Sequence, residues 1–242
     1  MTESEDIFYF KQFQVIQRQN VMKVGTDGVL LGAVACHPQP KNILDIGTGC
    51  GLIAMMVAQS HSLAVVDAID ISLDAIELAQ TNFENSPFNA RLNAFAVGIS
   101  AFAETSTTSY DLIVSNPPFF TGGNFSPSAY RNLMRQTFQL SHQDLLRSVH
   151  KLLGTDGVFW VILPHLEGLR FVEMARFYNL QHNATVKVIS RAGKPIERLI
   201  LRFSHHTTPL DEDTLYIHQA VNNAYSPDYI AKTKNFYPFM AD

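Results

Sequence analysis

The sequence has few cysteines and no long apolar run. Only Cys36 and Cys50 occur among its 242 residues, and they form neither a CxxC pair nor a Cys/His spacing typical of zinc. This argues against a disulfide framework and against a bound metal. No run reaches the ~18 apolar residues that span a bilayer, and the first six residues include three acids, whereas a signal peptide begins with basic residues. We therefore expect a cytoplasmic protein without a membrane partner.

Charged residues are also scarce, at 17% of the chain against 46% hydrophobic residues. This composition allows a sizeable core and excludes disorder as the default state. The net charge of −4 argues against binding of a polyanion over the whole surface. The charge is uneven, however, because residues 1–130 hold five Lys and Arg against 12 Asp and Glu, whereas residues 131–202 hold 11 against five. Such a basic stretch can steer RNA to one face of a protein, and its candidate RNA-binding residues are Arg131, Arg135, Arg191, Lys194 and Arg198.

Short apolar runs alternate with helical segments from Ile43 onward, which predicts an α/β fold with a parallel sheet wrapped by helices. The predicted strands are 43–46, 64–69, 92–97, 110–114 and 158–163. The predicted helices are 52–59, 72–84 with Ser72 as its cap, 144–153 and 166–178. Residues 186–190 and 199–203 flank the turn signal Gly193-Lys194-Pro195, and we expect them to pair as an antiparallel hairpin.

The chain is expected to form a single domain and to be a monomer. Residues 1–40 would form a small hairpin and a helix that Thr26 caps, residues 41–204 the sheet core, and residues 205–242 a C-terminal extension. The polar stretch 100–109 is expected to be a surface loop. The aromatic residues of the extension are expected to dock on the body.

The segment Asp45–Gly51, with the sequence DIGTGCG, joins a predicted strand to a predicted helix. Glycines in such a turn let a ligand approach the backbone. Their spacing differs from the G-x-G-x-x-G of dinucleotide sites, and no G-x-x-x-x-G-K-[ST] phosphate motif is present. The carboxylate of Asp45 suits a cationic ligand such as S-adenosylmethionine. Asp70, at the end of the next strand, is placed to accept hydrogen bonds from ribose hydroxyls. A structural turn without a ligand is the alternative interpretation.

A second motif, Asn116-Pro117-Pro118-Phe119, follows the predicted strand 110–114. Its prolines make the turn rigid and remove backbone donors, which leaves the Asn116 amide oxygen and the Pro117 carbonyl as acceptors. Two acceptors can hold both N–H groups of an exocyclic amine on a base and so favour attack of its lone pair on a methyl sulfonium. Phe119 would stack on the base. An ordinary turn is again the alternative.

Together these motifs resemble those of class I S-adenosylmethionine-dependent methyltransferases that act on amino groups. More narrowly, the chain resembles the bacterial tRNA-valine (adenosine-37-N6)-methyltransferases over nearly its whole length, through Phe10–Phe13, Met22–Gly28, Leu44–Gly47, Ser115–Phe119, Arg135 and Phe239-Met240. The resemblance implies a Rossmann-like fold with a mostly parallel seven-stranded sheet and an antiparallel C-terminal hairpin. It also implies a tRNA substrate that is methylated on N6 of an adenosine next to the anticodon.

The resemblance further assigns roles to individual residues. The implied cofactor-binding residues are Lys23, Thr26, Asp27, Asp45, Gly47, Gly49, Gly51 and Asp70. The first three would close the pocket, the next four would line the methionine part of the cofactor, and the last would take the ribose. The residues from Asn116 to Phe119 would hold the target adenine. The chain departs from the family at Gly98, where members usually have an acid that contacts the cofactor adenine.

Three alternative functions remain open at this point. Release-factor glutamine N5-methyltransferases use the same Asn-Pro-Pro chemistry but normally carry a helical domain ahead of the core, whereas 44 residues precede Asp45 here. Ribosomal-RNA guanine-N2 methyltransferases usually need further sequence. A non-catalytic nucleotide- or RNA-binding module is the third alternative, because a fold does not determine its function and because the expected acid is missing at Gly98.

Overall fold

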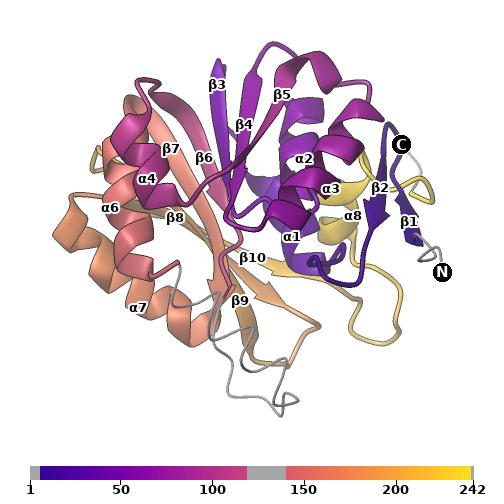
Figure 1. Cartoon of the computed structure of the whole chain (residues 1–242). Coiled ribbons are helices and arrows are strands. Elements are labelled where there is room, and N and C mark those ends of the chain that lie inside the picture. The colour runs from indigo at the N-terminus through magenta and orange to yellow at the C-terminus, as the bar shows by residue number, and fades with distance from the viewer. Residues whose placement is uncertain (1–5, 119–139, 241–242) are drawn as a thin grey trace, which may run out of the picture.

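A central sheet organises the computed structural model, which describes residues 6–118 and 140–240 (Figure 1). The strands of this sheet are β3 (Asn42–Ile46), β4 (Val65–Asp70), β5 (Leu92–Ala96), β6 (Tyr110–Ser115), β7 (Leu153–Pro164), β8 (Gln181–Ile189), β9 (Ile196–Ser204) and β10 (Asp211–Tyr216). They follow the order β10-β8-β9-β7-β6-β3-β4-β5. Strands β3 to β7 pair in parallel, and β8 and β9 form the predicted antiparallel hairpin. The predicted fold class is thus confirmed.

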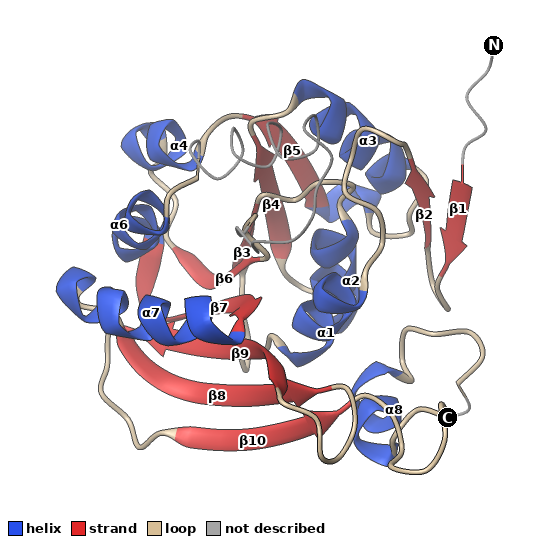
Figure 2. Cartoon of the chain, turned by 90° about the horizontal axis from the view of Figure 1, so that it is seen from below, coloured by secondary structure: helices blue, strands red, loops and turns tan. Residues whose placement is uncertain are grey.

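Helices cover both faces of this sheet (Figures 1 and 2). One face carries α1 (Thr26–Val34), α2 (Leu52–Ser60), α3 (Leu73–Glu84) and α8 (Pro227–Thr233). The other face carries α4 (Ile99–Thr105), α6 (His142–Leu152) and α7 (His165–Ala175). Two short 3-10 segments are Asn89–Arg91 and Arg176–Tyr178. Among the described residues, no helix is both long and apolar enough to cross a bilayer.

The apolar residues of the strands are divided between two cores. Ile43 of β3 belongs to the core that also holds Leu30 of α1 and Met55 of α2. The next residue, Leu44, belongs to the core on the opposite face, together with Leu146 of α6. All five side chains are fully buried. Because both faces of the sheet are covered, its central strands are apolar at nearly every position, which is why they could be recognised as short apolar runs.

Within the described residues, the sheet has eight strands rather than the expected seven, because β10 pairs in parallel with β8. From the sequence, this segment belongs to the C-terminal extension, because Asp211, Glu212 and Asp213 are polar and do not form an apolar run. In the structure, these three residues are exposed. Leu215 is the strand residue that reaches the core. Acidic residues of this kind are typical of edge strands, where the backbone pairs on one side and the charges prevent further pairing on the other.

The prediction of a surface loop over residues 100–109 is wrong, because Ile99–Thr105 form helix α4. Ile99 and Ala103 are buried on one side of the helix, and Phe102 packs partly against the same core. Apolar residues at positions i, i+3 and i+4 form one helical face. That face stabilises the helix against the sheet even though polar residues lie between its members.

Of the two predicted helix caps, one is confirmed by the structure and the other is wrong. The Ser72 hydroxyl accepts a hydrogen bond from the Ala75 N–H and caps α3 as predicted. Helix α1 instead begins after Gly25, so that Thr26 is its first residue rather than its cap.

The N-terminal hairpin and the C-terminal tail pack against each other, as Figure 1 shows. The hairpin consists of β1 (Asp6–Tyr9) and β2 (Gln14–Gln17), which pair antiparallel. The rings of Phe10 and Tyr237 stack with their centres 5.8 Å apart, and the Lys11 N–H donates to the Phe236 carbonyl at 2.7 Å. Phe236 and Tyr237 are buried. The predicted hairpin is confirmed, and so is the predicted docking of the tail aromatics for Tyr229, Phe236 and Tyr237, whereas Phe239 is 64% exposed.

A buried asparagine joins the hairpin to the body of the protein. The Asn82 side chain, on α3, accepts a hydrogen bond from the Ile16 N–H at 2.8 Å and donates to the Ile16 carbonyl at 3.1 Å. Its amide also donates to the Cys50 carbonyl at 2.8 Å. Asn82 is 1% exposed, so water cannot replace these bonds if the side chain is removed.

Replacing Asn82 by Ala should therefore lower the free energy of unfolding by about 2–4 kcal/mol, because it leaves buried backbone groups of β2 without partners. Urea unfolding measures this change. The matched control is Asn85→Ala, which removes an exposed side chain bonded to the Thr81 carbonyl near the end of the same helix and should change the free energy by less than about 1 kcal/mol. Equal effects of the two substitutions would contradict this role of Asn82.

Candidate active site

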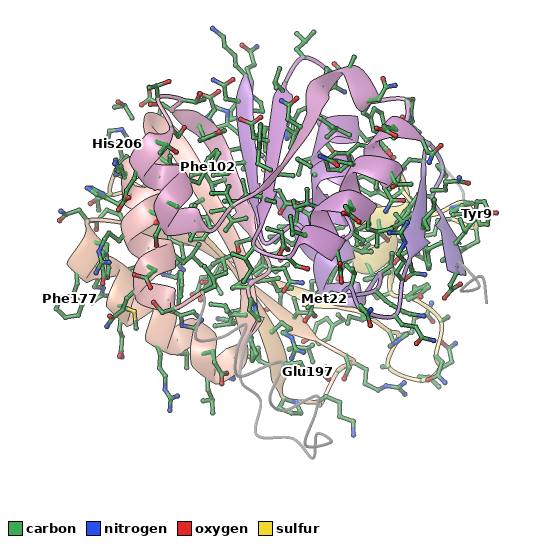
Figure 3. The ribbon with its side chains drawn as sticks, in the orientation of Figure 1. Tyr9, Met22, Phe102, Phe177, Glu197 and His206 are labelled. Carbon is green, nitrogen blue, oxygen red and sulfur yellow. The ribbon has the colours of Figure 1, made fainter. Side chains whose placement is uncertain are left out.

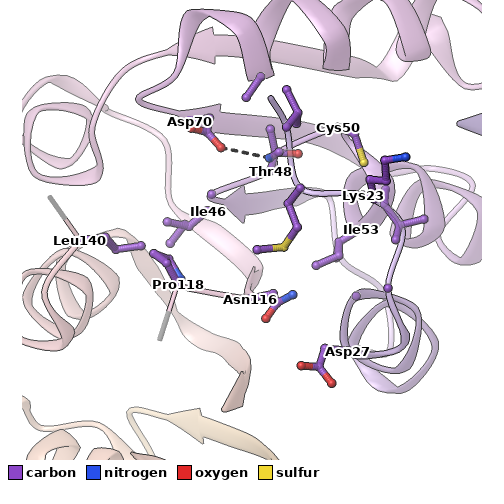
Figure 4. Close-up of a pocket in the computed structure, with 18 of the residues that line it drawn as sticks. Lys23, Asp27, Ile46, Thr48, Cys50, Ile53, Asp70, Asn116, Pro118 and Leu140 are labelled. Carbon is purple, nitrogen blue, oxygen red and sulfur yellow. Dashed lines mark hydrogen bonds between the residues drawn. The ribbon is translucent and has the colours of Figure 1, made fainter. Parts of the chain in front are cut away.

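A cavity of about 770 Å³ lies at the carboxyl ends of β3, β4 and β6 (Figure 4). The strand order reverses here, because β4 lies on one side of β3 and β6 on the other. Open α/β sheets bind their ligands at such a switch point, and small-molecule sites typically have volumes of about 300–1,000 Å³. The predicted site residues that line the cavity are Lys23, Thr26, Asp27, Gly47, Gly49, Asp70, Asn116, Pro118 and Arg198.

The three glycines of the loop between β3 and α2 serve two different purposes. Gly47, Gly49 and Gly51 have φ angles of 74°, 56° and 84°, a conformation that favours glycine. A Cβ on Gly47 or Gly49 would meet nothing within 4 Å, and both residues border the cavity. A Cβ on Gly51 would lie 2.5 Å from the ring of Phe83. Gly51 therefore allows close packing of α2 on α3 and, contrary to expectation, does not line the cavity.

Asp45 lies beneath this loop and supports it from inside. Its Oδ2 accepts hydrogen bonds from the Thr48 hydroxyl at 2.7 Å and from the Ala54 N–H at 3.1 Å. The side chain is fully buried and does not line the cavity, so the expected direct contact with the methionine part is not supported. Burial raises the pKa of Asp45 to about 7; the two hydrogen bonds oppose this rise and the charge of Asp70 adds to it.

Asp70 ends β4 and lines the cavity, as predicted (Figure 4). Its Oδ2 accepts a hydrogen bond from the Gly49 N–H at 3.0 Å, and its Oδ1 accepts one from the Ser72 N–H at 2.9 Å. These bonds fix the carboxylate at the edge of the glycine loop. Each oxygen keeps a further lone pair that can accept a hydrogen bond from a hydroxyl group.

The wall next to Asp70 is apolar. Ile71, Val97 and Ile99 line the cavity there, and Gly98 stands directly before helix α4. Glu104 is exposed near the end of that helix and does not line the cavity. The position of the missing acid is thus surrounded by side chains that can pack on a flat ring without bonding to its edge.

Asn116 stands at the end of β6 on the other side of the cavity. The preceding residue, Ser115, is fixed by its hydroxyl, which donates to the Ile46 carbonyl at 2.9 Å. The Asn116 side-chain oxygen is buried and accepts no hydrogen bond within the described part of the chain. Pro118 also lines the cavity, whereas Pro117 is buried behind it. Phe119, the last residue of the motif, lies outside the described residues.

Segments from both ends of the chain complete the cavity. Lys23 pairs at the surface with Asp6, at 3.3 Å, and Asp27 forms an ion pair with Arg198, in which Nε and Oδ2 are 2.8 Å apart. Met22 and Glu197, both labelled in Figure 3, line the cavity from the N-terminal segment and from β9. The sequence predicts neither of them.

Two apolar residues of the cavity lining are also not predicted by the sequence. Val188 at the end of β8 and Ile217 after β10 line the cavity. Local sequence carries no signal for such a role, because an apolar residue in a strand is normally a core residue. Their position depends on the C-terminal hairpin folding back beside the carboxyl ends of the parallel strands.

The predicted RNA-binding residues do not all share one surface. Arg191 and Lys194 lie in the turn between β8 and β9, where the Arg191 guanidinium donates to the Asn223 side chain at 2.6 Å. Arg198 instead bonds to Asp27 in the wall of the cavity. Arg131 and Arg135 lie outside the described residues.

Comparisons with known proteins identify the family of this chain. A family model described as "Methyltransferase small domain" matches residues 23–187. A tRNA1(Val) (adenine(37)-N6)-methyltransferase of Flavobacterium psychrophilum is 40% identical over 96% of this chain and 99% of its own length. A protein of the same name from Pectobacterium carotovorum is 39% identical over 99% of this chain and 97% of its own length.

Solved structures show the same fold. A protein of Agrobacterium tumefaciens described as a predicted O-methyltransferase has a TM-score of 0.70 at 16% identity and matches 87% of this chain and 96% of its own. The 16S rRNA N2 G1207 methyltransferase of T. thermophilus, in complex with AdoMet and guanosine, has a TM-score of 0.58 at 19% identity and matches 83% of this chain and 50% of its own.

The doubly wound sheet, the cavity at its switch point and the family model together define a class I methyltransferase. Sequence identity near 40% to the two relatives, over almost the full length of this chain and of each relative, identifies the family within this class. The chain belongs to the family of the tRNA1(Val) (adenine(37)-N6)-methyltransferases.

The raised pKa of Asp45 predicts a pH-dependent stability. The folded protein holds the carboxyl proton up to about pH 7, whereas an unfolded chain releases it near pH 4, so this group lowers the stability as the pH rises through that window. Asp45→Asn removes the effect. Relative to the wild type, the variant should gain about 2–3 kcal/mol of unfolding free energy between pH 5 and pH 8.

Urea unfolding at the two pH values checks this prediction. Asp74→Asn, which changes an exposed carboxylate in the first turn of α3, is the control and should show the same difference from the wild type at both pH values. A difference for Asp45→Asn that does not change with pH would mean that the buried carboxyl is ionised throughout.

Proposed function

We propose that this protein methylates the N6 amine of adenosine 37 in a valine tRNA, with S-adenosylmethionine as the methyl donor. The Asn116 side-chain oxygen carries the proposal, because it is buried and without a partner among the described residues while its residue lines the cavity. A buried acceptor without a partner is stabilised when a bound ligand donates a hydrogen bond to it. The names of the relatives support the tRNA and the position of the base.

The residues of the cavity fit S-adenosylmethionine. Gly47 and Gly49 leave the backbone accessible beside the methionine part, and the Asp70 carboxylate is placed to accept hydrogen bonds from the ribose. The apolar wall of Ile71, Val97 and Ile99 suits the adenine ring, so the missing acid at Gly98 does not exclude binding. When bound, this cofactor supplies an electrophilic methyl group on a sulfonium centre.

Asn116 and Pro117 act on the amine of the target base. The amide oxygen of Asn116, which lines the cavity, accepts a hydrogen bond from one N–H group. The backbone carbonyl of Pro117 would accept from the other N–H group, although Pro117 is buried and is not part of the cavity lining. Together the two bonds turn the nitrogen lone pair away from the ring and toward the methyl group. Rigid prolines keep both acceptors in place before the base arrives. No strong general base is required. The nitrogen gains the methyl group as the methyl–sulfur bond breaks, and the cationic nitrogen is then acidic enough to give its proton to water.

A base of tRNA has to leave its stack to reach these residues. Val188 and Ile217 offer it apolar surface in the part of the cavity that borders the C-terminal hairpin. Arg191 and Lys194 lie in the turn of this hairpin, where they can contact phosphates of the RNA backbone. One nitrogen of the Arg191 guanidinium donates to Asn223, and its other N–H groups remain to bind a phosphate. Arg198 is not counted among them, because its guanidinium bonds to Asp27.

Asn116→Ala should reduce the rate of methyl transfer to tRNA by at least about 100-fold, because the amine loses its side-chain acceptor in the transition state. The dissociation constant of S-adenosylmethionine, measured by calorimetry, should change by less than about threefold. Methyl transfer is measured with radiolabelled cofactor and an unmodified valine tRNA transcript.

The control is Asn93→Ala, which removes an exposed side chain bonded to Asp67, on the neighbouring strand. It should methylate at the wild-type rate. Full activity of Asn116→Ala would reject the mechanism. A wild-type protein that binds the cofactor and tRNA without methylating would instead be a binding module.

Replacing both Arg191 and Lys194 by Gln should weaken tRNA binding. It should also reduce the slope of log affinity against log salt concentration by about two. Each phosphate contact that is lost removes about 0.9 from the slope. Filter binding between 50 and 200 mM salt, as test conditions, measures both quantities. The control exchanges Arg147 and Lys151, two exposed residues of α6, for Gln. An unchanged slope for the first variant would reject this surface.

A further inference from the structure

One ion pair bridges two walls of the cavity that come from distant parts of the sequence. Arg198 Nε and Asp27 Oδ2 are 2.8 Å apart, and their side chains are 28% and 24% exposed. Arg198 Nη1 also donates to the Glu197 carbonyl at 3.1 Å. Both residues line the cavity, and Figure 4 labels Asp27 among the lining residues. A pair that is largely shielded from water is screened less than one at the surface.

The Asp27 side of this pair is rigidly attached to the cofactor loop. Asp27 stands in the first turn of α1, where the helix dipole favours a negative charge. Helix α1 packs closely on α2, because a Cβ on Gly28 would lie 3.1 Å from Leu52 Cδ2 and a Cβ on Gly32 would lie 2.7 Å from Met56 Sδ. Helix α2 starts directly after Gly51. The position of Asp27 is thus tied to the cofactor side of the cavity.

The Arg198 side is attached to the wall that borders the target base. In the sheet, Arg198 lies opposite Val188 of β8 and opposite Pro164 at the end of β7. Val188 itself lines the cavity. Strand β9 runs antiparallel to β7, so its first residues lie at the edge where the parallel strands end. Arg198 therefore moves with the C-terminal hairpin.

We propose that Asp27 and Arg198 act as one positioning pair, which holds the hairpin wall at a fixed place relative to the cofactor loop and so aligns the target amine with the methyl group. This shared role differs from the two separate roles that the sequence indicates, in which Asp27 closes the cofactor pocket and Arg198 contacts RNA. It rests on the function proposed above. A misplacement of reacting atoms by about 1 Å lowers rates by about 100-fold.

A double-mutant cycle tests the pair. Asp27→Asn and Arg198→Gln should each lower kcat for tRNA methylation by at least about tenfold, with less than threefold changes in the dissociation constant of S-adenosylmethionine and in KM for tRNA. The double variant should be no slower than the slower single variant, because one interaction is lost in all three. Arg198→Lys should recover part of the loss. All assays run at least about 15 °C below the melting temperature of each variant.

The control is Glu212→Gln, which breaks an ion pair with Lys187 of similar length, 2.8 Å, between β10 and β8. It should leave kcat unchanged. The proposal is overturned if the single variants keep wild-type kcat, or if their losses multiply while Asp27→Asn weakens the cofactor and Arg198→Gln raises KM for tRNA. A wild-type protein that is inactive on tRNA overturns the proposed function and this inference with it.

Discussion

The architecture of the site depends on one buried carboxylate oxygen. Asp45 Oδ2 bonds to the Thr48 hydroxyl and to the Ala54 N–H, and it thereby closes the turn that joins β3 to α2. This turn holds Gly47 and Gly49 in the left-handed conformation beside the cavity. It also directs α2 back along the sheet, where α1 packs on it. A change in this contact would displace the glycine loop and the helix that carries Asp27 together.

The cavity is made by segments that are far apart in the sequence. The glycine loop and Asp70 come from the first half of the parallel sheet, whereas Val188 and Arg198 come from the C-terminal hairpin. The switch in strand order leaves a gap between β4 and β6 at the carboxyl edge, and the antiparallel hairpin closes one side of that gap. The cavity is thus lined by segments from both halves of the chain, with Asn116 directly after the central strand β6.

Much of this arrangement could be predicted from the sequence. Fully buried parallel strands appear as short apolar runs, and both the glycine loop and the Asn-Pro-Pro motif directly follow such runs. Asp70 and Asn116 accordingly lie where the sequence places them. These features are local, because each depends on a strand, the turn after it and the residue types in that turn.

The features that could not be predicted depend on tertiary contacts. Asp27 and Arg198 are 171 positions apart, and no local pattern indicates that their charges meet. Strand β10 is stabilised by pairing with β8 rather than by its own polar residues. The acidic residue before the glycines suggested a ligand contact at Asp45, but its carboxylate faces inward and bonds to the loop instead. Burial of an ionisable group for a structural purpose is decided by the packing around it.

The proposed reaction can be tested directly on its product. Purified protein is incubated with S-adenosylmethionine and an unmodified valine tRNA transcript, and the digested RNA is mapped by mass spectrometry, with a transcript carrying guanosine at position 37 as the control. The structure and the family predict one N6-methyladenosine at position 37 and none in the control. Methylation at another nucleotide, equal methylation of both transcripts or no methylation of either would contradict the proposed function.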